Sequence, residues 1–280
     1  MSPTKRQRTL SRRRFLTLGA AGLAGAGLFD ILWLEPRGVR IEKLSLATGQ
    51  SGRTVRVVQI SDLHLSDFDG YFQQVAGMVK GLSPDLIVLT GDYLEEERNI
   101  RGVLDFLRAL KAPSGVFAVQ GNWEYWSRLE GENLRRHFLG AGARLLINER
   151  TDLDIGGQRL SLLGLDYPSS SDHLQGLQGQ ADAARFNLLL SHVPAFAHEQ
   201  LDQRVGLILS GHTHGGQVRL PLLPPLYLPR FSGRFVSGLY QVGRYDTPLY
   251  VNRGIGTSVL PVRLNCRPEI TVIELTGQGA

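Results

Sequence analysis

The chain of 280 residues is long enough to bury one large hydrophobic core or two small ones. Its hydrophobic fraction of 42% is that of an ordinary globular protein, and its single cysteine, Cys266, excludes an internal disulfide. The net charge of +5 does not indicate nucleic-acid binding, because six basic residues precede position 15 and the other 25 are balanced by 26 acidic residues.

The basic N-terminus leads into an apolar stretch that is typical of an export signal. Ser11-Arg12-Arg13-Arg14-Phe15-Leu16 resembles a twin-arginine signal, and about fifteen small or apolar residues end at Phe29. This run is short and glycine-rich for a transmembrane helix. Ala24-Gly25-Ala26 fits a cleavage site, whereas the apolar residues 31–34 leave a retained anchor open. We therefore expect residues 1–40 to be a twin-arginine signal peptide or N-terminal anchor. The protein would use the twin-arginine translocase and be periplasmic or membrane-associated.

The main domain is expected to span residues 41–280 and to begin with two strands. Residues 41–47 alternate in polarity, residues 55–60 are rich in β-branched side chains, and Gly49 and Gly52 lie between them. This pattern predicts a β-hairpin.

Helical and strand patterns then follow in order. Apolar residues at helical spacing predict helices at 71–82, 103–110 and 133–139. Strands are expected at 86–90, 115–119, 145–147, 153–155, 160–165, 187–190, 205–209, 248–252 and 270–275. Strands alternate with helices in the first half and dominate the second, which indicates an α/β domain with a mixed pair of sheets flanked by helices.

Residues that can bind metal ions follow the ends of several predicted strands, where α/β sheets place their sites. Taken singly, each is more often a helix cap, a turn residue or a hydrogen-bonded buried histidine. Seven of them in succession are difficult to assign to chance, and they are Asp62, His64, Asp92, Asn122, His192, His212 and His214.

The order of these residues resembles the calcineurin-like metallophosphoesterases. The motifs are Asp62-Leu63-His64, Gly91-Asp92, Gly121-Asn122, a lone His192 and Gly211-His212-Thr213-His214, within about residues 55–275. The longer segments 211–217 and 250–258 resemble the exported YkuE/YaeI-like branch. The resemblance implies a four-layer α/β/β/α sandwich of two mixed sheets flanked by helices.

The same resemblance implies two divalent metal ions. One would bind Asp62, His64 and His214, the other Asn122, His192 and His212, with Asp92 bridging them. Asp92, Asn122 and His192 are also expected to be catalytic. Imidazole and carboxylate ligands without a thiolate suit manganese, zinc or iron, and the sequence does not identify the metal. Two cations about 3.5–4 Å apart can share a bridging hydroxide that attacks a phosphodiester or pyrophosphate bond.

One position departs from the family pattern. The family commonly has Gly-Asn-His-Asp or Gly-Asn-His-Glu, whereas this chain has Gly121-Asn122-Trp123-Glu124. An indole donates a hydrogen bond but exchanges no proton near pH 7. Three interpretations remain open. The substrate has a good leaving group, or His173 or His198 replaces the family histidine as the proton donor, or the activity is reduced. Glu124 is expected to orient a metal-ligating histidine.

Three other stretches are considered for the surroundings of the site. Asp172 and His173 are expected in a loop, which either overhangs the site or is a simple polar turn. His198 is expected on a helix, where a histidine is most often at the surface. Residues 220–229 contain four prolines, which prevent a helix or central strand. This apolar segment follows the metal motif and is expected at the rim of the site, suited to an acyl chain or a membrane surface, or packed on its own domain.

The sequence therefore predicts an exported, dinuclear metal-dependent phosphoesterase. By resemblance, the substrate is a lipid-linked pyrophosphate such as UDP-2,3-diacylglucosamine, or equally a generic phosphodiester or phospholipid headgroup. The alternative, motivated by Trp123, is a non-catalytic or weakly active metal- or lipid-binding protein at the membrane surface. The exact substrate and the oligomeric state are not determined.

Overall fold

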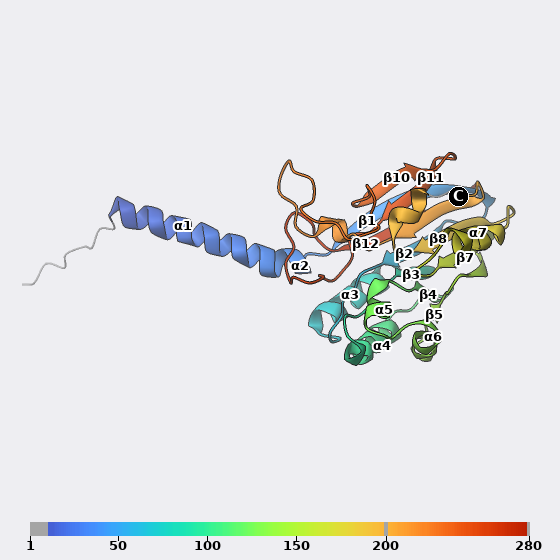
Figure 1. Ribbon diagram of the computed structural model, residues 1–280, viewed down its shortest axis with the longest axis horizontal. Helices are drawn as coiled ribbons and strands as arrows, with labels where there is room; N and C mark the ends of the chain where they lie inside the picture. Colours follow the sequence, from blue (N-terminus) through green and yellow to red (C-terminus); the bar gives the residue numbers. More distant parts are fainter. Residues whose placement is uncertain (1–10, 199–200, 279–280) are drawn as a thin grey trace, which may run out of the picture.

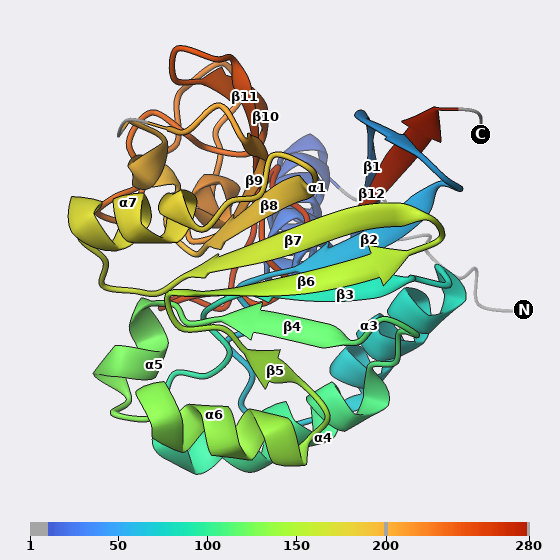
Figure 2. The same cartoon turned by 90° about the vertical axis from the view of Figure 1, so that its right-hand side faces the viewer.

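Two six-stranded sheets face each other at the centre of the structure, and helices cover their outer faces (Figures 1 and 2). The computed structural model describes residues 11–198 and 201–278. The first sheet has the strand order β1-β12-β2-β3-β4-β5, and the second has the order β10-β11-β9-β8-β7-β6. Both sheets contain parallel and antiparallel pairs, so both are mixed.

The strands of the first sheet are β1 (Arg40–Ser51), β2 (Val55–Ile60), β3 (Leu86–Thr90), β4 (Val116–Val119), β5 (Arg144–Leu145) and β12 (Glu269–Gln278). Those of the second are β6 (Glu149–Ile155), β7 (Gln158–Leu165), β8 (Phe186–Ser191), β9 (Val205–Ser210), β10 (Gly238–Val242) and β11 (Thr247–Val251). The α-helices are α1 (Arg12–Phe29), α2 (Glu35–Arg37), α3 (Gly70–Gly81), α4 (Ile100–Ala109), α5 (Asn122–Trp126), α6 (Gly131–Gly140) and α7 (Ser171–Gly179).

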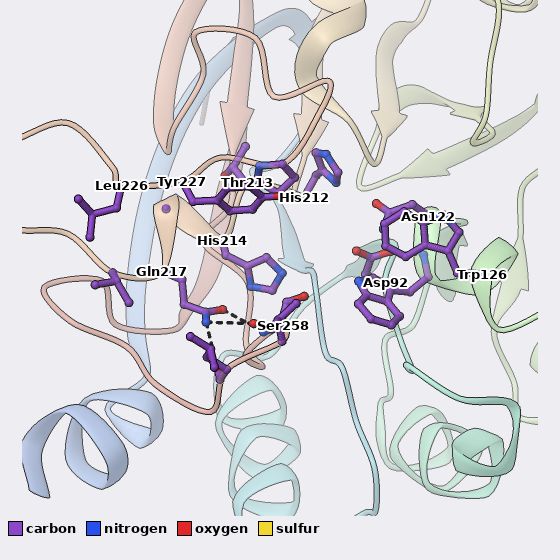
Figure 3. A pocket seen from close by; sticks show the side chains of 16 residues that line it. Asp92, Asn122, Trp126, His212, Thr213, His214, Gln217, Leu226, Tyr227 and Ser258 are labelled. Atoms are coloured by element: carbon purple, nitrogen blue, oxygen red, sulfur yellow. Dashed lines mark hydrogen bonds between the residues drawn. The ribbon is translucent and has the colours of Figure 1, made fainter. Parts of the chain in front are cut away.

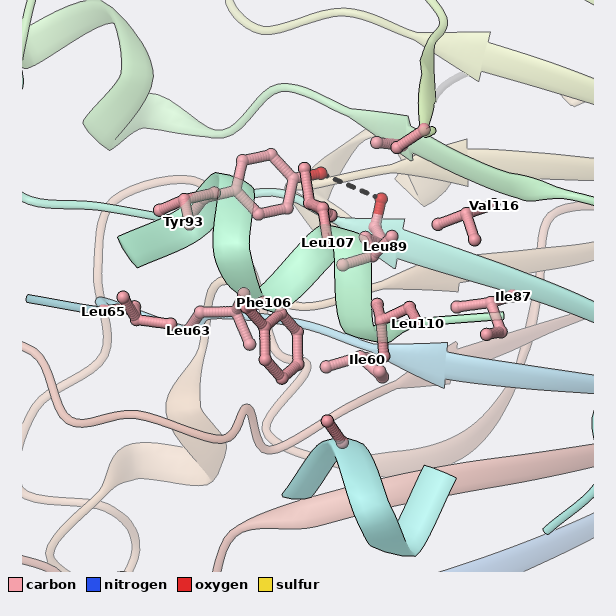
Figure 4. Packing of buried hydrophobic residues seen from close by; sticks show 14 of the residues in the cluster. Ile60, Leu63, Leu65, Ile87, Leu89, Tyr93, Phe106, Leu107, Leu110 and Val116 are labelled. Atoms are coloured by element: carbon pink, nitrogen blue, oxygen red, sulfur yellow. Dashed lines mark hydrogen bonds between the residues drawn. The ribbon is translucent and has the colours of Figure 1, made fainter. Parts of the chain in front are cut away.

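Side chains that alternate along the buried strands create three apolar layers between the four layers of structure. In β2, Val55 and Val57 pack between the two sheets, whereas Val58 and Ile60 pack against helices. Phe106 and other apolar side chains of α4 belong to this outer layer (Figure 4). On the other side, α7 packs against the second sheet. The predicted α/β/β/α sandwich is confirmed.

The predicted hairpin between β1 and β2 is wrong. Strand β12 lies between them, parallel to β1 and antiparallel to β2. The burial of each strand explains this order. Strand β12 is apolar and mostly buried, so it needs a partner on both sides, whereas β1 has alternately exposed residues and suits the edge of the sheet.

Most predicted elements lie within a few residues of their expected positions, but α5, α7 and β10 were not predicted. Helix α7 occupies the place where a loop with Asp172 and His173 was expected. Its N-terminus is capped because the Ser170 hydroxyl accepts a hydrogen bond from the His173 main-chain N–H at 3.3 Å.

The N-terminal helix projects away from the sheets (Figure 1). Helix α1 continues through a π-helical turn, Asp30–Leu34, into α2. Among the described residues, the stretch Arg12–Arg37 is the one helix long and apolar enough to cross a membrane. It is longer than the apolar run suggested, because helical structure continues past Asp30. The side chains in its apolar part are not buried, which excludes a buried core helix.

Parallel strands bring the metal-ligand motifs to one edge of each sheet. Strands β2, β3 and β4 are parallel neighbours, as are β11, β9 and β8. The loops that follow five of these strands carry the ligand residues found in the sequence. The two sheet edges therefore supply the two sides of one site.

Two glycines test the packing of this fold. A Cβ at Gly164 in β7 would lie 2.2 Å from Leu146 Cβ, so Gly164→Ala is expected to lower the free energy of unfolding by about 1–3 kcal/mol. Gly77 in α3 has no heavy atom within 4 Å of a built Cβ, and Gly77→Ala is expected to raise it by about 0.5–1 kcal/mol. Urea denaturation measures both changes. Equal effects of the two substitutions would contradict the packing described here.

Candidate metal centre

The fold brings all seven expected ligand residues together. Asp62, His64 and His214 form one group of ligand atoms within 4.8 Å of one another, and Asp92, His192 and His212 form a second. Asn122 Oδ1 lies 3.2 Å from His192 Nε2, which adds the amide to the second group. All seven residues are buried.

Asp92 lies between the two groups. Its Oδ2 atom is 3.1 Å from His192 Nε2 and 3.8 Å from His64 Nε2. Its Oδ1 atom accepts a hydrogen bond from the Trp123 main-chain N–H at 2.9 Å. One carboxylate oxygen therefore faces both groups while the other holds the carboxylate in orientation.

Main-chain carbonyls fix which ring nitrogens of the second group face inward. His192 Nδ1 lies 2.6 Å from the Thr90 carbonyl oxygen, and His212 Nε2 lies 2.6 Å from that of Arg230. A carbonyl oxygen only accepts, so these two nitrogens donate. The opposite nitrogens, His192 Nε2 and His212 Nδ1, then face each other at 3.1 Å.

These inward-facing atoms fit a cation. His212 Nδ1, Asp92 Oδ2 and Asn122 Oδ1 all lie 3.1–3.2 Å from His192 Nε2. A proton on that nitrogen can satisfy one of these acceptors, whereas a metal ion accepts a lone pair from every member of the set. Imidazole, carboxylate and amide donors without thiolate suit a divalent ion such as manganese, iron or zinc.

The electrostatics of the centre agree with this fit. Burial disfavours charge on Asp92 and His192, but their mutual attraction outweighs it. The pKa of Asp92 is lowered to about 2, and the pKa of His192 is raised to about 9. Burial and the charge of His192 lower the pKa of His212 to about 4. A bound ion would take the place of the proton that His192 holds.

The backbone around the centre is strained. Asp62, His64, Asp92, His212 and His214 have φ angles between 42° and 71°, in the left-handed region that non-glycine residues seldom adopt. Each such residue costs about 1–3 kcal/mol, and the surrounding contacts must hold it in place. The motifs in the sequence gave no indication of this strain.

Glycines precede several ligands because there is no room for a side chain. A Cβ at Gly211 would lie 2.3 Å from Asp62 Oδ2, and one at Gly121 would lie 2.2 Å from Asp92 Oδ1. The main-chain N–H of His212 can then donate to both carboxylate oxygens of Asp62 at 3.0 Å. The two sheet edges are connected through this contact.

Glu124 was expected to orient a metal-ligating histidine, but its described hydrogen bonds go to the main chain instead. Its carboxylate accepts hydrogen bonds from the main-chain N–H groups of Asp92, Tyr93 and Gly121, at 3.0, 2.7 and 2.7 Å. It therefore positions the loop that carries Asp92. The contact expected of Glu124 is made by Glu95, whose Oε1 atom lies 3.2 Å from His64 Nδ1. Glu95 follows Asp92 by three residues and belongs to none of the sequence motifs.

The two histidines considered as replacement acids have other positions. His173 is exposed and its Nδ1 accepts from the Ser170 main-chain N–H at 3.4 Å, within the cap of α7. His198 ends the 3₁₀-helix Pro194–His198, and its side chain lies outside the described part of the chain. Trp123 lines the pocket instead, with its ring 5.6 Å from the ring of His64 in a T-shaped contact.

A pocket of about 560 Å³ opens over the ligands. Asp92, Asn122 and Trp126 face His212 and His214 across it (Figure 3). The outer wall is mostly apolar and comes from Trp126, the segment 216–229 and the segment 258–260. The proline-rich stretch therefore lies at the rim, as the sequence predicted, although Trp126 and the 258–260 segment were not foreseen.

Comparison with known proteins agrees with the fold and the motifs. Residues 55–216 match the family model of calcineurin-like phosphoesterases. The chain is 33% identical to the uncharacterized metallophosphoesterase YkuE of Bacillus subtilis (strain 168), across 95% of this chain and 98% of YkuE. It is 32% identical to the phosphodiesterase YaeI of Escherichia coli (strain K12), across 95% of this chain and 99% of YaeI.

The fold is also found in a solved structure of the NAD nucleotidase NadN of Haemophilus influenzae. The sequences are 13% identical, the TM-score is 0.52, and the match covers 74% of this chain and 46% of that protein. At this identity the likeness concerns the fold alone.

The two ligand groups predict two metal ions per chain. Elemental analysis of protein loaded with manganese or zinc is expected to find about two. Asp92→Ala should lose both ions because Asp92 faces both groups, whereas His64→Ala should weaken mainly one. His137→Ala removes an exposed histidine on α6 and serves as the control, with no loss expected. A folded wild-type protein that binds no ion would contradict the assignment.

Proposed function

The chain belongs to the calcineurin-like phosphoesterase family, and on that premise we propose that it hydrolyses phosphodiester or pyrophosphate bonds with two divalent ions. The observation that carries the proposal is the convergence of carboxylate, amide and imidazole donors on either side of Asp92. We further propose that all seven residues bind the ions and that Asp92, Asn122 and His192 act in catalysis. Manganese, zinc and iron all suit this set.

The metal ions, when bound, would polarise the phosphoryl group and make water nucleophilic near neutral pH. The chain itself then has to hold its ligands in place and position the substrate. Asp92 is held by Glu124 and by the Trp123 main chain, so its carboxylate keeps its direction. His192 and His212 are held by main-chain carbonyls, which turns their inner nitrogens toward the space where an ion would bind. No serine, cysteine or histidine nucleophile is required.

Trp123 determines which bonds are cleaved well. Its indole stands where the family commonly has a histidine, and it cannot protonate a leaving oxygen near neutral pH. His173 caps α7, and therefore does not supply a replacement acid in this arrangement. We propose that the natural bond has a good leaving group, such as the nucleotide phosphate of a pyrophosphate. The second candidate is a non-catalytic or weakly active metal- or lipid-binding protein at the membrane surface. A protein that does not need a proton donor could also carry a tryptophan at position 123.

The apolar wall of the pocket supports a lipid-linked substrate. Leu226, Tyr227, Val259 and Leu260 line the same pocket as the expected metal ligands. A substrate with an acyl chain beside its phosphate, such as UDP-2,3-diacylglucosamine or a phospholipid, would place the chain against this wall.

The N-terminal segment supports export and an anchor. We propose that residues 1–40 are a twin-arginine signal or anchor and residues 41–280 the phosphoesterase domain. The root of the helix also contacts the domain, because the Glu35 carboxylate accepts from the Cys266 main-chain N–H at 2.6 Å. Cleavage near Ala24-Gly25-Ala26 would leave that contact intact, so the contact is compatible with a cleaved signal and with a retained one.

Activity against phosphodiesters of different leaving-group pKa tests the proposed function. The metal-loaded protein is expected to cleave bis-p-nitrophenyl phosphate well and alkyl esters poorly, since a general acid typically contributes about 10² to 10⁴-fold. Trp123→His should raise turnover of the poor substrates more than that of the activated one. Trp126→His, at the neighbouring tryptophan of the same pocket wall, is the matched control and should not change this ratio.

Two results would count against this account. Wild-type rates that hardly depend on leaving-group pKa would mean that another acid is present. Absence of turnover on every diester and pyrophosphate, in protein that holds two ions, would favour the non-catalytic alternative.

The export route is tested separately. Replacing both Arg12 and Arg13 by lysine is expected to leave the protein in the cytoplasm, because the twin-arginine pair is the feature that the translocase reads. The control replaces Arg6 and Arg8 by lysine, which makes the same charge-conserving exchange outside the motif. Cell fractionation and immunoblotting measure the outcome. Unchanged delivery of the Arg12/Arg13 variant would remove the twin-arginine assignment.

A further inference from the structure

Two loops at the rim of the pocket expose large apolar side chains to solvent. In the first loop, Leu222 is fully exposed at 104%, and Leu223, Leu226 and Tyr227 are also exposed. In the second, Val259 is 83% exposed and Leu260 is exposed. Together residues 220–227 and 259–260 are called the rim surface below. Large apolar side chains gathered at one place in this way indicate an interaction surface.

The two loops of the rim surface are held together as one unit. The Gln217 side-chain amide donates to the carbonyl oxygens of Ser258 and Leu260 at 3.1 and 3.0 Å. Its carbonyl oxygen accepts from the Ser258 main-chain N–H at 2.9 Å. The Arg219 main-chain N–H also donates to the Leu264 carbonyl oxygen at 2.8 Å. The exposed apolar residues therefore keep a fixed relation to each other.

The rim surface lies next to the root of the N-terminal helix. The Arg263 main-chain N–H donates to the Ile31 carbonyl oxygen at 3.2 Å, three residues after Leu260. Leu32, Trp33 and Leu34 are exposed at this same root. Figure 1 shows α1 leaving the domain at the end where these loops protrude. The apolar helix and the rim surface thus belong to one end of the molecule.

The segment that contains the first rim loop is positively charged, whereas at the second loop the Glu95 carboxylate is hydrogen-bonded to the Val259 main chain. Residues 212–245 contain Arg219, Arg230, Arg234 and Arg244 and no acidic residue. Within the described residues, Arg219, Arg230 and Arg234 form no ion pair. Arginines in the same segment as exposed leucines, without an ion pair among the described residues, suit a layer in which apolar chains lie beneath anionic headgroups.

We propose that the rim surface docks onto the lipid bilayer into which α1 inserts, so that the metal centre opens toward the membrane surface. The occupant of this surface is a bilayer with anionic headgroups. The leucines and valine enter the apolar layer, and the arginines contact lipid phosphates. The substrate class that follows is an amphiphile whose phosphoester lies at headgroup level, entering between the two loops. The substrate class rests on the proposed function, whereas the docking rests on a retained N-terminal helix and not on catalysis.

The test places a fluorophore on the rim surface of the full-length chain. Cys266 is buried, with 1% of its surface exposed, so an introduced cysteine can be labelled selectively with an environment-sensitive NBD group. Leu222→Cys and Val259→Cys carry the label at the rim surface. Leu139→Cys carries it at an equally apolar, 69% exposed position on α6, away from α1, and is the matched control. The proteins are reconstituted into vesicles of phosphatidylcholine and phosphatidylglycerol.

Docking predicts a blue shift at the two rim positions and none at Leu139. Nitroxide-labelled phosphatidylcholine should quench the rim labels and leave the control unquenched. Equal emission at all three positions would overturn the proposal. A blue shift without nitroxide quenching would overturn it as well, because the rim surface would then be covered by a second copy of the chain.

A second variant measures the energetics of docking. With the label at Val259→Cys, adding Leu222→Asp and Leu223→Asp should shift the equilibrium away from the docked state by at least about tenfold for each leucine. Leu139→Asp is the control for an added charge and should change nothing. None of these readouts depends on turnover. An inactive protein that still docks would therefore refute the proposed function alone, and an active protein that does not dock would refute this inference alone.

Discussion

The structure depends on the concentration of electron-pair donors around Asp92. Two sheets present buried carboxylates, an amide and imidazoles to one space, and inward-facing atoms approach to about 3 Å. Such an arrangement is unfavourable unless positive charge compensates it. A proton on His192 supplies part of that charge, and metal ions would supply more. The strained backbone at the ligands and the glycines that make room for carboxylates are the costs of bringing these donors together.

The sandwich can hold these donors together because its buried strands end only a few residues before each expected ligand. Buried strands β2, β3 and β4 end at Ile60, Thr90 and Val119, and the expected ligands lie two to four residues beyond. The loops then bond to each other across the sheets, as the His212 main chain does to Asp62. Glu124 contributes in a similar way by accepting three main-chain N–H groups near Asp92. The site is therefore held mainly by main-chain contacts, which a change of surface side chains would not disturb.

This reliance on the main chain explains what the sequence could and could not predict. Apolar runs and the residue types after them predicted the strands, the layered fold and the set of expected ligand residues, because burial and donor chemistry depend on the type of side chain. The insertion of β12 between β1 and β2 was not predictable from spacing, since the pairing joins residues more than 200 positions apart. The tautomers of His192 and His212 depend on the carbonyl groups of Thr90 and Arg230, for which any residue type would serve. Glu95 was missed because nothing in its local pattern distinguishes it from a solvated acid.

Arg263 and Cys266 connect the loop that carries His214 with the root of the N-terminal helix. The Arg263 guanidinium is fully buried and donates to the carbonyl oxygens of Arg253, Gly254, Gly256 and Cys266. The Arg263 main chain bonds to Ile31, while the Cys266 main chain bonds to Glu35 and the Cys266 thiol donates to the His214 carbonyl oxygen. A short series of hydrogen bonds thus runs from the root of the helix to His214, one of the expected metal ligands. Because buried donors and acceptors are costly to leave unpaired, the helix root cannot move far without disturbing the loop behind His214. The root of the N-terminal helix and the loop that carries His214 are therefore held together by the same short segment, residues 263–266.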